Sequence, residues 1–234
     1  MIFLLKKLYI MNTVLFIAVH PDDETLGCGG TILKHKAQGD RICWMTVTNA
    51  TKNHPLHFKD EFVAMRDKLV DTISQAYGFD ETIKLDLPTQ MLHTVDMKDF
   101  VVAVDDVIKR IRPNIIYMPF RDDVHSDHRY AFEAIYSCTK SFRKPYIEQI
   151  YMIEALSETE FSPAIPSTSF VPNVYVDITE YMDRKMEIMS MYEKEVMAEP
   201  YPRSLSSIQA LARVRGSRAG VMYAEAFMLL YEKR

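Results

Sequence analysis

The chain has 234 residues, of which 48% are hydrophobic and 26% charged, and this balance excludes an intrinsically disordered protein and predicts a sizeable folded core. The length fits one large α/β domain, and we treat residues 1–234 as a single domain. The formal net charge is −4 and no basic block occurs along the chain, which argues against nucleic-acid binding and against a patch for anionic membranes.

The first residues and the cysteines indicate a cytoplasmic protein. Residues 1–10 are apolar but interrupted by two lysines; they are too short to cross a bilayer and lack the basic start and small-residue cleavage site of a signal peptide. We therefore interpret residues 1–11 as a loose N-terminal extension and expect no membrane span. Cys28, Cys43 and Cys138 are odd in number and show no CxxC spacing, so a disulfide framework is not expected and a reducing compartment fits better.

Short β-branched runs alternate with helical patterns along the chain. The predicted strands cover residues 14–17, 41–48, 82–87, 114–118, 146–153 and 174–178. The predicted helices cover residues 31–38, 58–77, 96–111, a segment that begins after 128 and passes through 138, and then 179–196 and 204–215. This alternation predicts an α/β fold with a parallel sheet and right-handed crossovers. If the strand order is 3-2-1-4-5, the first and fourth strands are neighbours whose connections diverge, and the crevice between them is the expected ligand site.

Two polar motifs follow these two strands. His20-Pro21-Asp22-Asp23-Glu24 comes directly after the first strand and is followed by Gly27-Cys28-Gly29-Gly30. His125-Ser126-Asp127-His128 lies in the charged loop after the fourth strand. Because both motifs stand at the carboxyl ends of neighbouring strands, we expect side chains about a hundred residues apart in sequence to meet.

Together the two motifs contain the ligands of an open catalytic metal site. Two imidazoles and one carboxylate, with water completing the shell, are typical of catalytic zinc, and iron or cobalt accept similar ligands. His20 and Asp23 can turn toward one ion, and either His125 or His128 supplies the second imidazole. Such an ion lowers the pKa of its bound water and polarises a carbonyl. Asp22 should project differently from Asp23 and is a candidate general base, while the remaining histidine can stabilise an oxyanion and protonate a leaving amine. The combination predicts hydrolysis of an unactivated amide.

Two other patterns have less support. Gly27 and Gly29 after a strand are typical of a dinucleotide-binding turn, but Ile32 stands where the third glycine belongs, and no acidic residue ends the second predicted strand. His54 and His57 have a metal-like spacing without a cluster of acidic neighbours, so we expect both in a solvated loop.

The motifs resemble those of the LmbE-like, or PIG-L, N-deacetylases. The segments 20–24 and 27–30 are similar to the opening signature of that family, and 125–128 is similar to its second, HxDH-type signature. The tail Arg215-Gly216-x3-Gly220-x2-Tyr223-Ala224-Glu225-Ala226-Phe227 is similar to its bacterial members. The resemblance extends roughly from Val14 to Phe227, and it implies a three-layer, Rossmann-like fold with a mostly parallel central sheet.

The resemblance also implies roles for the motif residues. It implies a zinc ion bound by His20, Asp23 and His128, and so chooses between the two histidines that the sequence pattern leaves open. It makes Asp22 the general base and His125 the group that stabilises the tetrahedral intermediate.

Two further residues receive roles only through the resemblance. Asp127 is expected behind His125 or His128 as an orienting acceptor. Arg66 occupies a place similar to that of the family's substrate-binding arginine, although Lys68 and Leu69 stand where an acidic neighbour is common.

We therefore expect a zinc-dependent deacetylase of a small-molecule N-acetylated sugar conjugate, of the N-acetylglucosamine type. The resemblance implies a homo-oligomer, a trimer or a hexamer, and we expect the loops 49–57 and 156–172 to shape the mouth of the site. The alternatives are a zinc amidohydrolase acting on another N-acyl substrate and a non-catalytic sugar- or nucleotide-binding protein of the same fold. The retained Asp22 argues against the binding protein, because a pure binder has no use for a base beside a metal.

Overall fold

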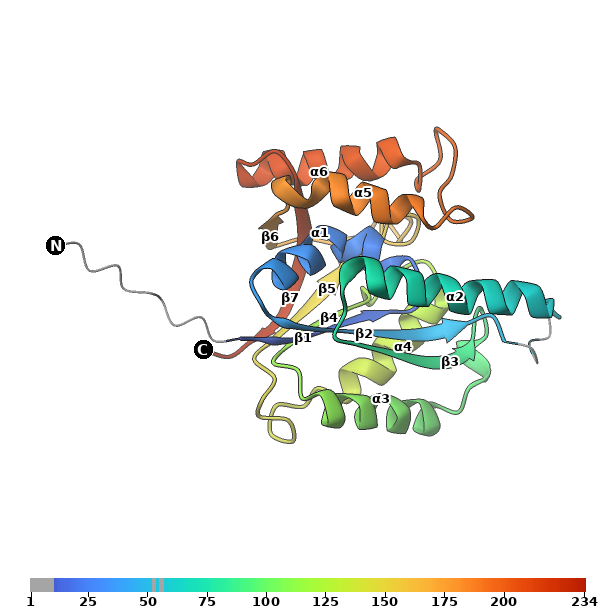
Figure 1. Cartoon of the computed structure of the whole chain (residues 1–234). Helices are drawn as coiled ribbons and strands as arrows, with labels where there is room; N and C mark the ends of the chain where they lie inside the picture. The colour runs from blue at the N-terminus through green and yellow to red at the C-terminus, as the bar shows by residue number, and fades with distance from the viewer. Residues whose placement is uncertain (1–10, 52–53, 55–56) are drawn as a thin grey trace.

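A computed structural model describes residues 11–51, 54 and 57–234, so the proposed extension lies almost wholly outside the described residues (Figure 1). The strands are β1 (Thr13–Ala18), β2 (Arg41–Asn49), β3 (Glu81–Pro88), β4 (Ile115–Met118), β5 (Gln149–Ile153), β6 (Val174–Asp177) and β7 (Ala224–Glu232). The α-helices are α1 (Asp23–Ala37), α2 (Asp60–Tyr77), α3 (Met97–Ile111), α4 (Ser126–Ser137), α5 (Met182–Ser190) and α6 (Leu205–Ala219). None of the described helices is long and apolar enough to cross a membrane.

All seven strands belong to one sheet with the order β3-β2-β1-β4-β5-β7-β6. The first five strands are parallel, and β7 pairs antiparallel with both β5 and β6. The predicted mostly parallel α/β sheet and the order 3-2-1-4-5 are therefore confirmed. The tail contributes β7, a strand that the sequence analysis does not include, and this strand extends the sheet beyond β5.

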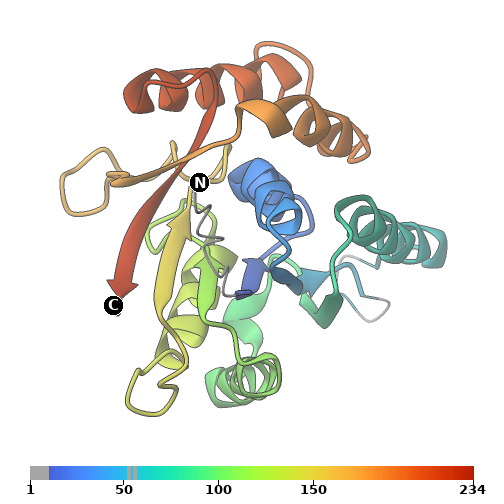
Figure 2. The ribbon, with the colours of Figure 1, turned by 60° about the vertical axis from the view of Figure 1, so that its left-hand side comes forward.

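Helices cover both faces of the sheet, which gives the three layers (Figures 1 and 2). Alternate residues of β1 serve the two faces: Leu15 and Ile17 pack with α3 and α4, whereas Val14 and Phe16 pack with α1, α2, α5 and α6. This alternation follows from the two-residue period of a strand. Because both faces are covered, β1 and β2 are buried along nearly their whole length, as their continuous apolar sequences indicate.

Helix α1 begins eight residues earlier than predicted, at Asp23 instead of residue 31. The helix is kinked at Cys28, whose φ of −144° and ψ of 18° are not helical. Glycine at this end of the helix is needed for packing, since a Cβ on Gly30 would lie 2.6 Å from the side chain of Ile178. Close contact with the segment after β6 therefore outweighs the poor helical propensity of this segment.

A buried ion pair fixes the kinked helix to the C-terminal strand. The Glu225 carboxylate of β7 accepts hydrogen bonds from the backbone N–H groups of Gly30 and Thr31, both at 2.8 Å. It also pairs with Lys185 Nζ of α5 at 2.7 Å, and Lys185 donates to the Leu26 carbonyl at 2.9 Å. The N–H groups that the kink leaves without helical partners thus receive an anionic acceptor, which explains why the tail motif belongs with the first motif.

The substitution Glu225→Ala is expected to destabilise the fold by about 3–5 kcal/mol, because it leaves the buried Lys185 ammonium without its counter-charge. Removing the other partner, by Lys185→Met, should destabilise the fold less, because the Glu225 carboxylate still accepts hydrogen bonds from the N–H groups of α1. Urea unfolding of the two variants checks this order. A loss below about 1 kcal/mol for Glu225→Ala, on the scale of an exposed ion pair, would contradict the structural role.

Candidate active site

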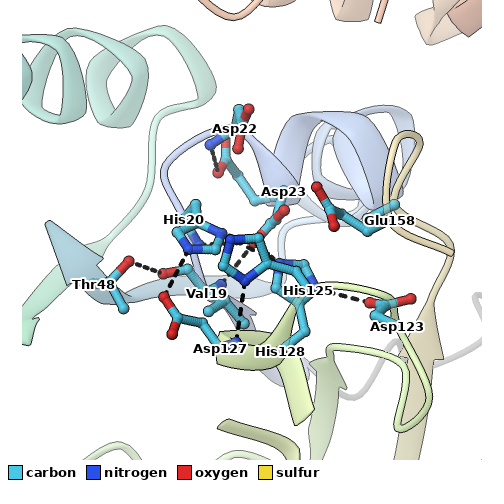
Figure 3. Close-up of polar contacts among 12 residues, drawn as sticks. Val19, His20, Asp22, Asp23, Thr48, Asp123, His125, Asp127, His128 and Glu158 are labelled. Atoms are coloured by element: carbon cyan, nitrogen blue, oxygen red, sulfur yellow. Dashed lines mark hydrogen bonds and ion pairs between the residues drawn. The ribbon is translucent and has the colours of Figure 1, made fainter. Parts of the chain in front are cut away.

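The two polar motifs meet at the carboxyl edge of the sheet (Figure 3). Strand β1 ends at Ala18, and a short turn through His20 leads into α1; β4 ends at Met118, and its loop leads to α4, with His125 at the N-cap. Since β1 and β4 pair directly in parallel, their following loops emerge side by side. The predicted convergence of the motifs is what the structure shows.

Three side chains at this edge offer ligand atoms to one point. His128 Nε2 lies 3.3 Å from both Asp23 Oδ2 and His20 Nδ1, and His20 Nδ1 lies 4.0 Å from Asp23 Oδ2. Their ligand atoms all lie within 4.8 Å of one another. Although burial alone would raise the pKa of Asp23, the neighbouring His128 and His20 hold it well below its usual range. A carboxylate ionised in this way beside two imidazoles is the donor set of a divalent cation.

Each of these histidines is oriented by a carboxylate on its other nitrogen. Asp127 Oδ2 lies 3.2 Å from His20 Nε2, and Asp123 Oδ2 lies 2.8 Å from His128 Nδ1. Asp123 is itself held by the Thr159 hydroxyl at 2.7 Å. A carboxylate behind a histidine is typical of metal ligands, because it fixes the ring and leaves the opposite nitrogen free to coordinate. The residues present therefore fit a bound metal ion.

A second group, His20, His125 and Asp127, also brings its ligand atoms within 4.8 Å. We favour the first group, because both oxygens of Asp127 already accept backbone hydrogen bonds, whereas the backbone donors to Asp23, the N–H groups of Val19 and His20, both bind Oδ2. At Asp127, Gln90 N–H donates to Oδ2 at 2.6 Å and Leu92 N–H donates to Oδ1 at 3.1 Å.

Asp127 orients a different histidine from the expected ones. Its carboxylate contacts His20, not His125 or His128. The reason is that Asp127 lies in the first turn of α4, which aims its side chain across the loop toward β1 and the segment after β3. The orienting role for His128 falls to Asp123, which the sequence analysis does not single out, because no periodicity in an irregular loop marks it.

The substitution Asp123→Asn is expected to weaken zinc affinity about 10–100-fold, as is typical when the acceptor behind a metal-binding histidine is weakened. Asp122→Asn makes the same chemical change one residue earlier, where the carboxylate pairs with Arg121 instead, and should leave the affinity unchanged. Competition with a chelating dye measures both constants. Equal zinc affinities in the two variants would contradict the proposal that Asp123 orients His128.

His125 is held in a defined neutral form. The backbone N–H of Asp127 donates to His125 Nδ1 at 3.1 Å, so in the neutral ring the proton resides on Nε2. Burial, with the neighbouring His20 and His128 rings, lowers the pKa of His125 to about 4. His125 lines the cavity, where this arrangement provides an N–H donor.

Asp22 is not part of the cluster formed by His20, Asp23 and His128. Its backbone φ of 144° is rare for a residue with a side chain, and its carbonyl accepts from the N–H groups of Thr25 and Leu26 at the start of α1. The Asp22 carboxylate lines the cavity and accepts a hydrogen bond from Arg203 Nη1 at 3.0 Å. Burial, and next the charge of Asp23, raise the pKa of Asp22 well above its usual range.

The cavity over these groups has a volume of about 370 Å³. One wall comes from Phe58, just before α2, and from Phe62 and Arg66 in the first turns of that helix. Another wall comes from Glu195 and Arg203 in the segment between α5 and α6. Arg66 thus lies in the cavity wall, where Nη1 pairs with Glu195 at 2.5 Å.

The two loops expected at the mouth do contribute to the cavity, through Ala50 and through Ser157 and Glu158. Burial raises the pKa of Glu158 to about 7. His54 departs from the expected solvated loop: it is 2% exposed, and its Nε2 lies 2.7 Å from the Thr89 carbonyl.

Comparison with known proteins agrees with this geometry. The family described as "PIG-L: GlcNAc-PI de-N-acetylase" matches residues 15–139. A diacetylchitobiose deacetylase of Thermococcus kodakarensis is 23% identical over 226 residues, which cover 92% of this chain and 82% of the relative.

Solved structures share the whole fold. A conserved protein from Thermus thermophilus superposes with a TM-score of 0.74 at 24% identity, covering 96% of this chain and 97% of that one. A 4-carboxy-2-hydroxymuconate hydratase from Pseudomonas putida superposes with a TM-score of 0.72 at 17% identity, covering 96% and 98%. Since the fold also carries a hydratase, the reaction must be argued from the site and from relatives in sequence. The match over residues 15–139, more than half of the chain, shows that this protein belongs to the PIG-L, or LmbE-like, family.

Proposed function

We propose that the protein is a zinc-dependent hydrolase that removes the acetyl group from an N-acetylglucosamine-type sugar conjugate. The observation that carries the proposal is the cluster of His20, Asp23 and His128 beside a carboxylate, Asp22, that is not part of the cluster and faces the same cavity. The similarity to a diacetylchitobiose deacetylase supports N-deacetylation.

The metal would be held by His20, Asp23 and His128, with Asp127 and Asp123 orienting the two rings. When bound, zinc supplies a Lewis acid that polarises a carbonyl and lowers the pKa of water, and iron(II) or cobalt(II) accepts the same donors.

The surrounding side chains supply the proton transfers. The Asp22 carboxylate takes a proton from the attacking water while the water oxygen bonds to the acetyl carbon. The His125 Nε2–H group donates to the oxygen on which negative charge develops. When the carbon–nitrogen bond breaks, the departing nitrogen takes the proton held by Asp22 and not one from His125, because the lowered pKa of His125 keeps its ring neutral. The products are acetate and a free amine.

The cavity lining supports a sugar as the substrate. Phe58 and Phe62 form a pair of rings 5.4 Å apart, which offers an apolar surface to the face of a pyranose. Arg66, Glu158 and Glu195 offer donors and acceptors to hydroxyl groups around it. The trimer or hexamer implied by the family resemblance stays a prediction, which light scattering can test.

A substrate screen tests the proposed reaction. The zinc-loaded protein is incubated with N-acetylglucosamine, N,N′-diacetylchitobiose and N-acetylated peptides, and acetate and primary amine are quantified together. We expect equimolar acetate and amine from the sugars and much less from the peptides. Preferential cleavage of the peptides would indicate a different amidohydrolase, and absence of acetate with every compound would contradict the proposal.

A further inference from the structure

Arg203 connects the candidate base to the far wall of the cavity. It lies in the segment between α5 and α6, directly before Ser204, the N-cap of α6. Its Nη1 is 3.0 Å from Asp22 Oδ2 and 3.2 Å from Glu195 Oε2. The other oxygen of Glu195 receives Arg66, so one carboxylate anchors two arginines and ties α2 to this segment.

The contact between Arg203 and Asp22 can fix the direction in which the Asp22 carboxylate points. Among the residues that the structure describes, Arg203 alone donates a hydrogen bond to the Asp22 carboxylate. The Asp22 side chain is only 5% exposed, so its oxygens depend on protein donors for hydrogen bonds, and Arg203 is the donor that the described residues supply.

One donor of Arg203 points to no protein acceptor among the described residues. Its Nε is buried and has no partner among the described residues, although a guanidinium on a free surface would direct that N–H to water.

We propose that Arg203 is a positioning residue that keeps the Asp22 carboxylate aimed into the cavity, with Glu195 holding Arg203 from behind. The inference rests on the proposed deacetylation, in which Asp22 must reach the attacking water. Arg203 contributes by restricting the rotation of that carboxylate, so its loss should slow the chemical step more than it weakens substrate binding.

A double-mutant cycle on the full-length, zinc-loaded protein tests this, with N,N′-diacetylchitobiose as the probe. Arg203→Gln is expected to lower kcat about 10–100-fold while KM changes less than about threefold. In the Asp22→Asn background the same substitution should change kcat less than about twofold, because the carboxylate it positions is gone. Arg203→Lys should restore part of the rate, because an ammonium group can still donate to Asp22.

Arg215→Gln is the matched control. Arg215 pairs with Glu154 at 2.8 Å with comparable burial but lies outside the cavity lining, so its loss should lower the Tm without a comparable fall in kcat. An equal loss for Arg203→Gln in both Asp22 backgrounds, or a rise in KM alone, would overturn the inference.

Crystal structures separate this inference from the proposed function. If the wild type released no acetate at all, the proposed function would fail, but Asp22 should still turn away from the cavity in the Arg203→Gln structure. An Asp22 carboxylate in the same position in both structures would overturn the positioning role whatever the activity.

Discussion

Replacing Asp22 by asparagine is expected to lower the rate of acetate release by about 10²–10⁴-fold, the usual cost of losing a general base. The amide of asparagine fills the same space and can still contact Arg203, but it cannot accept the proton of the attacking water. Because Asp22 is not one of the three clustered ligands, the variant should retain one zinc ion per chain. Steady-state kinetics and metal analysis of the same preparation measure both quantities.

The control for this experiment is Asp80→Asn. Asp80 pairs with Lys36 outside the cavity lining, and its substitution should leave turnover unchanged. If Asp22→Asn turned over substrate at the wild-type rate, Asp22 could not be the general base. Loss of zinc together with activity would place Asp22 among the ligands.

The substitution His20→Ala is expected to abolish stoichiometric zinc binding and, with it, acetate release. It removes one of three ligands and also leaves the Asp127 carboxylate without the ring that it orients. Metal analysis after dialysis against zinc-free buffer measures the effect. His93→Ala provides a comparison, since His93 lies near Tyr130 and outside the cavity lining, and it should keep its zinc. A full equivalent of zinc in His20→Ala would contradict the ligand assignment.

The central part of the fold could be predicted because its sequence signals are local and mutually consistent. The apolar runs of β1, β2 and β4 are short and bounded, and the helices between them require right-handed crossovers, which leaves few strand orders. The strand order then places residues 20–24 and 125–128 at one edge. This is why two motifs far apart in the chain can be joined from the sequence alone.

Other parts of the site depend on contacts that no local pattern records. Arg203 and Glu195 reach the cavity from an irregular segment, and Asp123 reaches His128 from a loop, so neither periodicity nor spacing marks them. Strand β7 carries a local signal, the apolar run of residues 227–231, which the predicted strands do not include. The burial of Glu225 within this strand follows from its pairing with α1 and Lys185, which no local pattern records.

The most direct measurement is the stoichiometry of metal required for acetate release. Zinc is removed from the wild-type protein with a chelator and returned in steps while acetate from N,N′-diacetylchitobiose is quantified. The proposed zinc site predicts no release from the metal-free chain and a linear rise that ends at one zinc per chain. Release that survives the chelator, or a fully loaded protein that yields no acetate from any N-acetylated sugar, would contradict the account.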